Sequence, residues 1–132
     1  MSQSISLYKQ LANHKLFKKS VKFGLKRIKL ALSLLGSPEK KLKNTISVIG
    51  ESGKYTTLFS LKSFIEANNQ TVTAHISPSL RDIKERFYMG KKHLSHKVIK
   101  ETIKQIEKLN IPLTVFECLT LVYIINASKI NA

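Results

Sequence analysis

The stretch Ile46-Ser-Val-Ile-Gly-Glu-Ser-Gly-Lys-Tyr-Thr-Thr57 combines an apolar run, a turn with two glycines and the start of a helical pattern. A strand, a glycine-bearing turn and a helix in this order aim backbone N–H groups and a helix N-terminus at a phosphate. Gly50 and Gly53 let the backbone approach a ligand closely, and Lys54 is long enough to reach the outer phosphates. Thr56 carries a hydroxyl suited to a magnesium ion. The stretch therefore predicts a P-loop-like nucleotide site.

The spacing of this motif departs from the general phosphate-loop pattern, which has a longer segment between its glycines. Here only Glu51 and Ser52 separate them. A polar turn that merely joins a strand to a helix is an equally good interpretation of the segment taken alone. Glu51 also places negative charge where an anion would bind, and Tyr55 adds bulk close to the phosphates. Both interpretations stay open at this point.

Length and composition indicate one domain with a modest core, since the chain has 132 residues, of which 42% are hydrophobic and 23% charged. No secretory signal is visible in residues 1–14. The most apolar stretch, residues 113–127, is too short to span a bilayer and contains Glu117 and Asn126. The single Cys118 excludes an internal disulfide and fits a reducing compartment. We expect a cytoplasmic protein that does not cross a membrane.

The net charge of +15 has two interpretations. Clustered cations suit a polyanion, because they neutralise phosphates and release counterions. The excess is almost entirely lysine, however, as AT-rich coding produces, and only Arg27, Arg81 and Arg86 carry a guanidinium. Aromatic residues are sparse and not interleaved with the basic ones, as a base-stacking surface requires. Nucleic acid is therefore not the favoured partner, although an anionic substrate would benefit from the positive field.

Residues 1–44 are predicted to form an N-terminal helical segment. A short helix over residues 7–17 precedes a lysine-rich bend. A second helix begins near Val21 and is closed by Gly36 and Pro38. Its lysine face is typical of a solvated surface, and a basic amphipathic helix on a membrane is the less common alternative. Its apolar face consists of Leu25, Ile28, Leu32 and Leu35.

Residues 45–132 are predicted to form a partial ATP-binding α/β domain. A strand over 45–49, a helix that ends near Asn68 and a strand over 71–76 make a βαβ unit, which implies a parallel sheet with flanking helices. Ser77-Pro78 ends the second strand at its carboxyl edge, where ligands collect in such sheets. The sequence thus predicts an incomplete mononucleotide-binding fold.

The C-terminal third is predicted to be mainly helical. Residues 81–90 form a short helix or a loop, and an amphipathic helix follows that is marked by Val98, Ile103 and Ile106. Residues 114–126 are apolar on nearly every face, as in a helix buried in a core. Glu117 near its start is either a helix-start carboxylate favoured by the helix dipole or a metal ligand or base facing the nucleotide.

Four segments in order resemble motifs of the folylpolyglutamate synthase and dihydrofolate synthase family, which is related to the Mur ligases. The resemblance covers almost the whole chain, but only the amino-terminal portion of the family's length. The segments are Gly24-Leu-Lys-Arg-Ile28 with Leu34-Leu-Gly-Ser-Pro38, Val48-Ile-Gly-Glu-Ser-Gly-Lys-Tyr-Thr56, Ile76-Ser-Pro-Ser-Leu80 with Glu85-Arg86, and Thr114-Val-Phe-Glu117.

The resemblance implies an ATP-dependent ligase that adds glutamate to a folate or to dihydropteroate through an acyl phosphate, with ATP and Mg²⁺ as cofactors. Lys54 is the implied catalytic residue. The implied nucleotide-binding residues are Gly50, Ser52, Gly53, Lys54, Tyr55 and Thr56, and the implied metal ligands are Thr56, Ser77 and Glu117.

The family's later strands, its metal-binding histidine and its carboxy-terminal domain have no counterpart here, so we expect the chain to be inactive alone and to need a separate chain that supplies them. Ser79 also replaces the family's histidine after Ser-Pro. Two alternatives are a non-catalytic remnant and a basic module that binds nucleic acid or another anion. His93 and His96 are expected to be surface histidines, and Cys118 to pack as a small apolar group.

Overall fold

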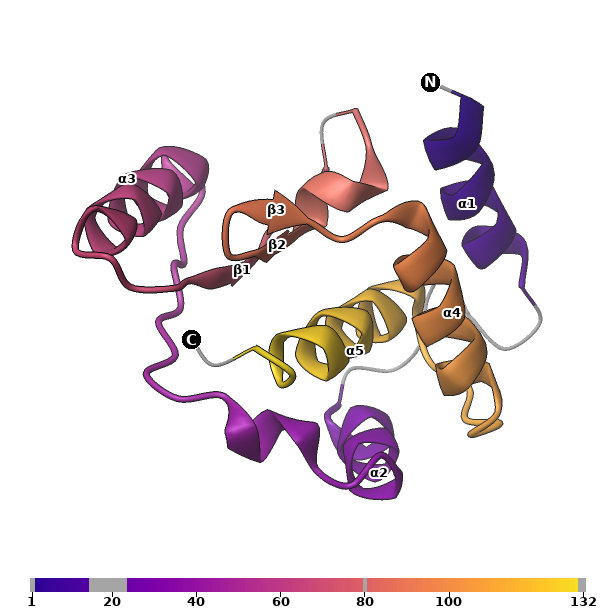
Figure 1. The fold of residues 1–132 in the computed structure, drawn as a ribbon. Helices are drawn as coiled ribbons and strands as arrows, with labels where there is room; N and C mark the ends of the chain where they lie inside the picture. Colours follow the sequence, from indigo (N-terminus) through magenta and orange to yellow (C-terminus); the bar gives the residue numbers. More distant parts are fainter. Residues whose placement is uncertain (1, 15–23, 80, 131–132) are drawn as a thin grey trace.

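The computed structural model describes residues 2–14, 24–79 and 81–130, which form helices around a small sheet (Figure 1). The elements in chain order are α1 (Ser2–Asn13), α2 (Lys26–Leu34), the 3-10 helix η1 (Pro38–Lys41), α3 (Lys54–Ala67), β1 (Thr73–His75), the 3-10 helix η2 (Ile83–Arg86), β2 (Phe87–Met89), β3 (Lys92–His93), α4 (His96–Glu107) and α5 (Val115–Ala127).

Helix α5 is the centre of the core. It contacts α4 and α2 as well as η1, β1 and β2, and most of its residues are buried. This confirms the prediction of a buried helix over residues 114–126. The core also contains Leu7 and Leu11 from α1 and Ala31 from α2, so buried residues come from both sides of the predicted boundary at residue 44. No helix in the described ranges is long and apolar enough to cross a membrane.

The ends of the helices follow local signals in the sequence. Gly36, with φ of 79°, and Ser37, with φ of 54°, end α2 in the left-handed region, and the N–H of Ser37 donates to the carbonyl of Leu32 at 2.8 Å. Ser95 caps α4 by accepting a hydrogen bond from the N–H of Val98 at 3.3 Å. The predicted stop of α2 and the predicted amphipathic helix α4 are thus confirmed. The predicted bend before α2 and residues 15–23 of the predicted helices lie outside the described residues.

The α/β class is correct, but the prediction of a parallel sheet is wrong. The described strands form an antiparallel sheet in the order β1–β2–β3, with Ala74 opposite Tyr88 and Met89 opposite Lys92. The partner of β1 comes from residues 81–90, which were predicted to be a short helix or a loop. That segment folds as η2 followed directly by β2. A hairpin partner close in sequence needs only a short connection, whereas a parallel partner needs a crossover.

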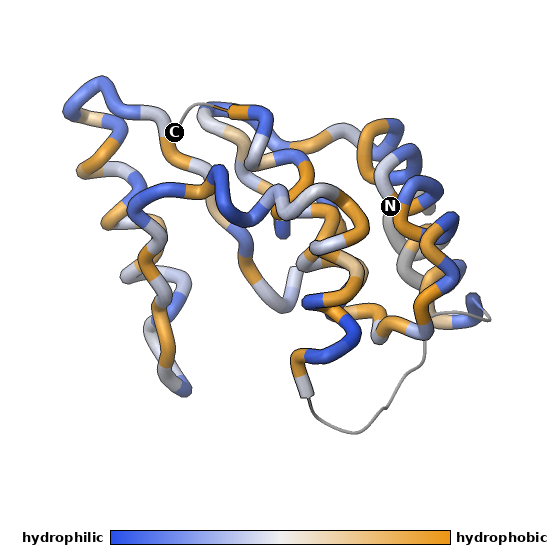
Figure 2. Tube along the Cα trace, turned by 90° about the horizontal axis from the view of Figure 1, so that it is seen from below, coloured by the Kyte–Doolittle hydropathy of each residue, from blue (hydrophilic) through white to orange (hydrophobic). Residues whose placement is uncertain are grey.

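The predicted strand over residues 45–49 does not form, and with it the βαβ unit is lost. The segment has no regular secondary structure and belongs to no sheet of the described residues. Ile46 and Ile49 are 61% and 92% exposed. Helix α3, which follows, has no buried residue, and Figures 1 and 2 both place it at the end of the molecule opposite α1 and α4. A strand is stable only when a neighbour satisfies its backbone and covers its apolar side chains, and this segment lacks both here.

Candidate functional site

The exposed turn at residues 50–53 leads directly into α3. Gly53 is the N-cap residue of this helix and takes a left-handed conformation with φ of 74°. Any other residue at this position would be strained by the left-handed φ. Its side chain would meet no steric obstacle, because no atom lies within 4 Å of the position that its Cβ would take. Gly53 offers no side-chain cap to the helix. The N–H groups of the first turn of α3 are therefore available to an anion, on the positive side of the helix dipole.

Lys54 folds back over the turn that precedes it. Its ammonium donates to the carbonyl oxygen of Gly50 and, at 2.7 Å, to that of Glu51. Glu51 and Ser52 are both exposed, so their side chains lie at the surface of the turn. The arrangement holds one positive charge on the turn that leads into α3. An incoming anion would meet that charge and the amides together.

The loop after β1 lies against the start of α3. The Tyr55 hydroxyl donates to the carbonyl oxygen of Pro78, and Thr56 is exposed in the same helical turn. Behind the loop, the buried guanidinium of Arg86 donates to the hydroxyls of Ser77 at 3.1 Å and Ser79 at 3.4 Å. The structure therefore joins the first turn of α3 to the loop that contains Ser77, through the side chain of Tyr55.

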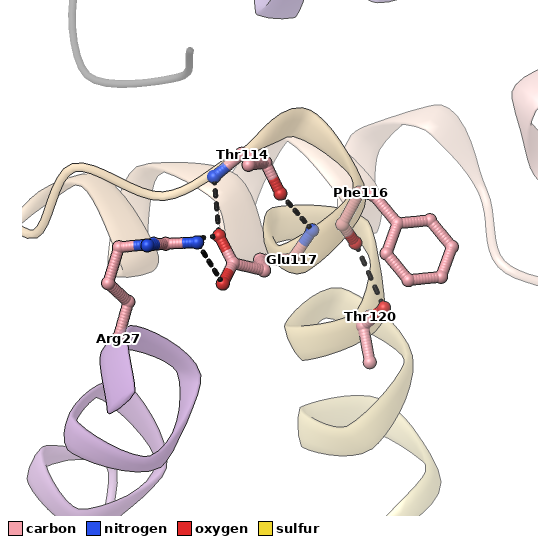
Figure 3. A network of polar contacts seen from close by, with 5 residues as sticks. All are labelled: Arg27, Thr114, Phe116, Glu117 and Thr120. Atoms are coloured by element: carbon pink, nitrogen blue, oxygen red, sulfur yellow. Dashed lines mark hydrogen bonds and ion pairs between the residues drawn. The ribbon is translucent and has the colours of Figure 1, made fainter. Parts of the chain in front are cut away.

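Glu117 lies in a different set of contacts, at the start of α5 (Figure 3). Its Oε2 accepts from the Thr114 N–H at 2.7 Å, and its own N–H donates to the Thr114 hydroxyl at 3.0 Å, which forms a capping box. Arg27 of α2 donates to Oε1 at 3.1 Å and to Oε2 at 3.3 Å. Glu117 is therefore a helix-start carboxylate that also joins α2 to α5, and its contacts in the described part of the chain are with Thr114 and Arg27, not with the turn at residues 50–53 or the Ser77 loop.

Sequence reasoning missed the roles of Arg27 and Arg86. It noted both as rare guanidiniums and as members of motifs, but it assigned neither a contact. Arg27 and Glu117 are 90 residues apart, and no periodic pattern predicts a pair at that separation. Arg86 precedes a strand that the pattern did not predict. The one available signal was scarcity, because in a lysine-rich chain the arginines are the residues suited to buried, multidentate contacts.

An aromatic cluster covers the junction of β1 and α5. The ring of His75 stacks on Tyr123 at 5.2 Å, on Phe87 at 5.6 Å and on Phe116 at 6.4 Å between centroids. Burial, and secondarily the charge of Arg86, lower the pKa of His75 to about 4. Its buried Nε2 has no hydrogen-bond partner among the described residues. His75 is therefore neutral at physiological pH and packs as an aromatic ring.

The remaining candidates are structural. His93 is exposed and contacts the Lys84 carbonyl at 3.0 Å, while His96 pairs with Asp82 at 3.0 Å. The described part of the chain contains no group of three or more His, Cys, Asp or Glu side chains placed to hold a metal. Cys118 is fully buried, and burial raises the pKa of its thiol to about 12. The prediction that it packs as a small apolar group is confirmed.

A groove of about 640 Å³ is lined by residues of β1, α3 and the segment 41–48, which begins at the end of η1. Leu61 and Ile65 of α3 and residues 71–75 are among its lining. Tyr123 and Ile130 line it as well. The groove is thus lined by residues of both segments, 45–49 and 71–76, that were predicted to pair in a parallel sheet.

Comparisons with known proteins agree with this architecture. No family model matches the sequence, and no curated protein matches it. Among solved structures, the fold is that of folylpolyglutamate synthases, which confirms the resemblance predicted from the four motifs.

The chain is similar to E. coli FolC, solved in complex with ADP and without folate substrate, with a TM-score of 0.82 and 28% sequence identity over 95% of this chain. It is also similar in fold to the folylpolyglutamate synthase of Thermotoga maritima, with a TM-score of 0.80 and 22% identity over 96% of this chain. The chain spans 29% and 30% of the lengths of these two proteins.

Proposed function

We propose that this chain binds Mg·ATP at residues 50–56 and is the nucleotide-binding part of an ATP-dependent amide ligase of the folylpolyglutamate and dihydrofolate synthase type. One observation carries the proposal. The start of α3 has no side-chain cap, and the Lys54 ammonium lies on the turn that leads into it, in a fold similar to that of a protein that binds ADP. Such a site neutralises and positions phosphates, and catalysis of phosphoryl transfer consists mainly of these two effects.

The phosphates would be held mostly by backbone. Gly50, Ser52 and Gly53 shape the turn, and the N–H groups of Lys54, Tyr55 and Thr56 are the donors. The Lys54 ammonium would exchange the carbonyls of Gly50 and Glu51, which it now contacts, for phosphate oxygens. A charged acceptor makes the stronger hydrogen bond, so this exchange is favourable. Lys54 is the proposed catalytic residue because it would neutralise the charge that develops on the transferred phosphoryl group.

The proposed metal ligands are the oxygens of Thr56, Ser77 and Glu117, which are the ligand type that Mg²⁺ prefers. The hydroxyls of Thr56 and Ser77 are on exposed residues. The Glu117 carboxylate accepts three hydrogen bonds out of about four lone-pair positions, so Oε1 retains capacity for a cation. When bound, Mg²⁺ would neutralise phosphate charge. Arg27 would then orient the carboxylate from its other side.

The complete ligase reaction is proposed only for an assembly larger than this chain, which spans 29% of the length of FolC. Its substrates would be ATP, glutamate and either a folate or dihydropteroate, in the cytoplasm. Residues 45–132 would supply part of the ATP-binding domain and residues 1–44 its helical support. Polypeptide outside these 132 residues would supply the rest. The isolated chain is expected to bind nucleotide without forming an amide.

Calorimetric titration of the chain with Mg·ATP tests the proposal. Lys54→Ala should weaken binding at least about tenfold, because a charge-assisted contact to phosphate is lost. Lys100→Ala is the matched control, since Lys100 is an exposed lysine on α4 and its removal changes the net charge equally. An unmodified chain that binds no Mg·ATP would refute the proposal.

A non-catalytic remnant is the second candidate, favoured by the hydrogen bonds of the Lys54 ammonium to its own turn and by the negative Glu51. This candidate predicts that the chain is folded but does not bind Mg·ATP. Binding of a nucleic acid through the net charge of +15 is distinguished by salt, because the affinity of such a complex falls steeply as the salt concentration rises. Mg·ATP held in a formed site would respond less steeply.

A further inference from the structure

One edge of β1 is unpaired. The Val72 carbonyl accepts from the Gly90 N–H at 2.9 Å, and the Ile76 N–H donates to the Arg86 carbonyl at 3.1 Å. The backbone N–H and C=O groups of Val72, Ala74 and Ile76 therefore face β2. In an antiparallel pair the residues between them point their N–H and C=O groups the other way. Those of Thr73 and His75 therefore face away from β2. Among the described strands, none pairs with this edge.

The unpaired edge borders the groove of about 640 Å³, which Thr73 and His75 both line. Ile46 and Val48 of the segment 41–48 also line the groove, as does Leu61 of α3. Backbone donors and acceptors with apolar walls are the features that accommodate an added strand. The groove therefore fits an extended segment with apolar side chains.

The charge around the groove is positive. Lys41, Lys43 and Lys62 line it, and none of the described lining residues is Asp or Glu. Lys62 is paired with Glu66 at 2.7 Å, so the net positive charge comes from Lys41 and Lys43, which are exposed. Acidic residues on an incoming segment would be attracted to this rim, and to a chain of net charge +15.

We propose that this groove is the docking site of an extended, apolar segment with acidic flanks from another polypeptide, which adds as a strand to the free edge of β1. The similar FolC is more than three times longer than the part that this chain matches, since the match covers 29% of it, so related folds carry much more polypeptide. A second copy of this chain is disfavoured by mutual repulsion at +15 each. The inference does not depend on nucleotide binding at residues 50–56.

The chain's own segment 45–49 is the competing occupant. It lies along the groove, but no sheet of the described residues includes it, and Ile49 is 92% exposed. If this segment paired with β1 in solution, the amides of Thr73 and His75 would be protected from hydrogen exchange in the free chain. Such protection would overturn the proposal, whereas rapid exchange of both amides would support it.

The direct test uses a fluorescent peptide, Glu-Glu-Val-Thr-Ile-Thr-Val-Glu-Glu, and fluorescence anisotropy with the full chain. We expect saturable binding that is weakened at least about tenfold when the central Ile is replaced by Pro, which cannot extend a ladder of hydrogen bonds. Replacing the flanking Glu residues by Lys should weaken binding similarly. Equal binding of the Pro peptide would show attraction by charge alone and would overturn the proposal, as would no binding.

Two variants on one helix locate the site. Leu61→Glu places a carboxylate in the groove and should weaken binding of the acidic peptide at least about tenfold. Phe64→Glu makes the same change in charge at a residue that is 70% exposed and does not line the groove, so it should have little effect. If both variants lost the same affinity for the peptide, the peptide would bind elsewhere. The docking site would also be refuted if the free chain associated with itself and thereby blocked peptide binding.

Discussion

Helices α5 and α3 have nearly equal lengths, 13 and 14 residues, and opposite environments. Leu119, Leu121 and Val122 of α5 are fully buried, whereas α3 has no buried residue. Side-chain contacts attach α3 to the sheet side: Tyr55 bonds to Pro78, Phe59 packs edge-on against Tyr88 at 5.2 Å, and the Lys62 ammonium lies 5.4 Å from the centre of the Tyr88 ring. The element that follows the proposed nucleotide-binding turn is thus not the one that stabilises the fold.

The comparison has a practical consequence, because binding and stability can be altered separately. Core burial stabilises by roughly 1.5–3 kcal/mol per large apolar side chain, and most of that burial lies in α5 and its neighbours. Variants of the turn or of α3 should therefore leave the fold intact, while variants of α5 should unfold both regions. Three predictions test this difference, beginning with the largest effect.

Truncation of Leu119 should cause the largest loss of stability. Its side chain is fully buried in the core cluster, so Leu119→Ala removes apolar contacts and leaves a cavity. We expect the free energy of unfolding to fall by about 2–5 kcal/mol. Urea denaturation followed by circular dichroism measures this change.

The matched variant on α3 is Phe64→Ala. Because Phe64 is 70% exposed, the free energy of unfolding should change by no more than about 0.5 kcal/mol. If both variants destabilised the chain equally, α3 would be part of the stabilising core, and the contrast between the helices would be wrong.

The next effect is a loss of stability at acid pH, caused by His75, which links β1 to Phe116 and Tyr123 of α5. Its pKa in the folded chain is lowered to about 4 from 6.5, mainly by burial. The unfolded chain therefore binds the proton more tightly. The stabilisation is complete above pH 6.5 and is lost as the pH falls toward 4, by up to roughly 3 kcal/mol.

Urea denaturation at pH 7 and pH 5 measures this dependence before most carboxylates titrate. His75→Phe keeps an aromatic ring among the stacked partners and cannot take up a proton. Its stability should therefore change much less between the two pH values. An unchanged pH dependence in this variant would show that other groups cause the loss of stability. His75 would then not be the group that makes the contact between β1 and α5 sensitive to pH.

The same contrast explains what the sequence could and could not predict. The helices α4 and α5 were predictable because their apolar periodicity and capping residues, such as Ser95 and Thr114, are local signals. The sheet was not, because residues 45–49 read as a strand by composition although no neighbouring strand covers them. Strand pairing depends on contacts far apart in sequence, and here the polar segment 81–90 supplied the partner of β1.

For the site, local patterns predicted the turn and the helix start, and the order of the four motifs predicted the fold. They did not predict which side chains make the connections. Glu117 was singled out, but its partner Arg27 is 90 residues away. Tyr55 was expected to crowd the phosphates, and in the structure its hydroxyl reaches the Pro78 carbonyl instead. Motif spacing describes the backbone, and these contacts depend on side-chain packing.

The smallest expected effect concerns the attachment of α3. Tyr55→Phe removes the hydroxyl that donates to Pro78 and retains the ring near Phe59. One hydrogen bond is worth about 1 kcal/mol, so the hydrogen-bonded amides of α3, beginning with that of Thr57, should exchange about fivefold faster, with the global free energy of unfolding unchanged. Hydrogen exchange monitored by NMR resolves the two quantities.

Tyr123→Phe is the counterpart in the core region, because the Tyr123 hydroxyl lies 3.0 Å from the Thr73 hydroxyl. Each variant deletes one hydroxyl and one hydrogen bond, so a difference between them reflects location alone. Tyr123→Phe should lower the global free energy of unfolding by about 1 kcal/mol and leave the local exchange of α3 unchanged. If Tyr55→Phe instead lowered global stability by the same amount, α3 would unfold together with α5. The nucleotide turn would then be stabilised by the core, and the two regions would form one cooperative unit.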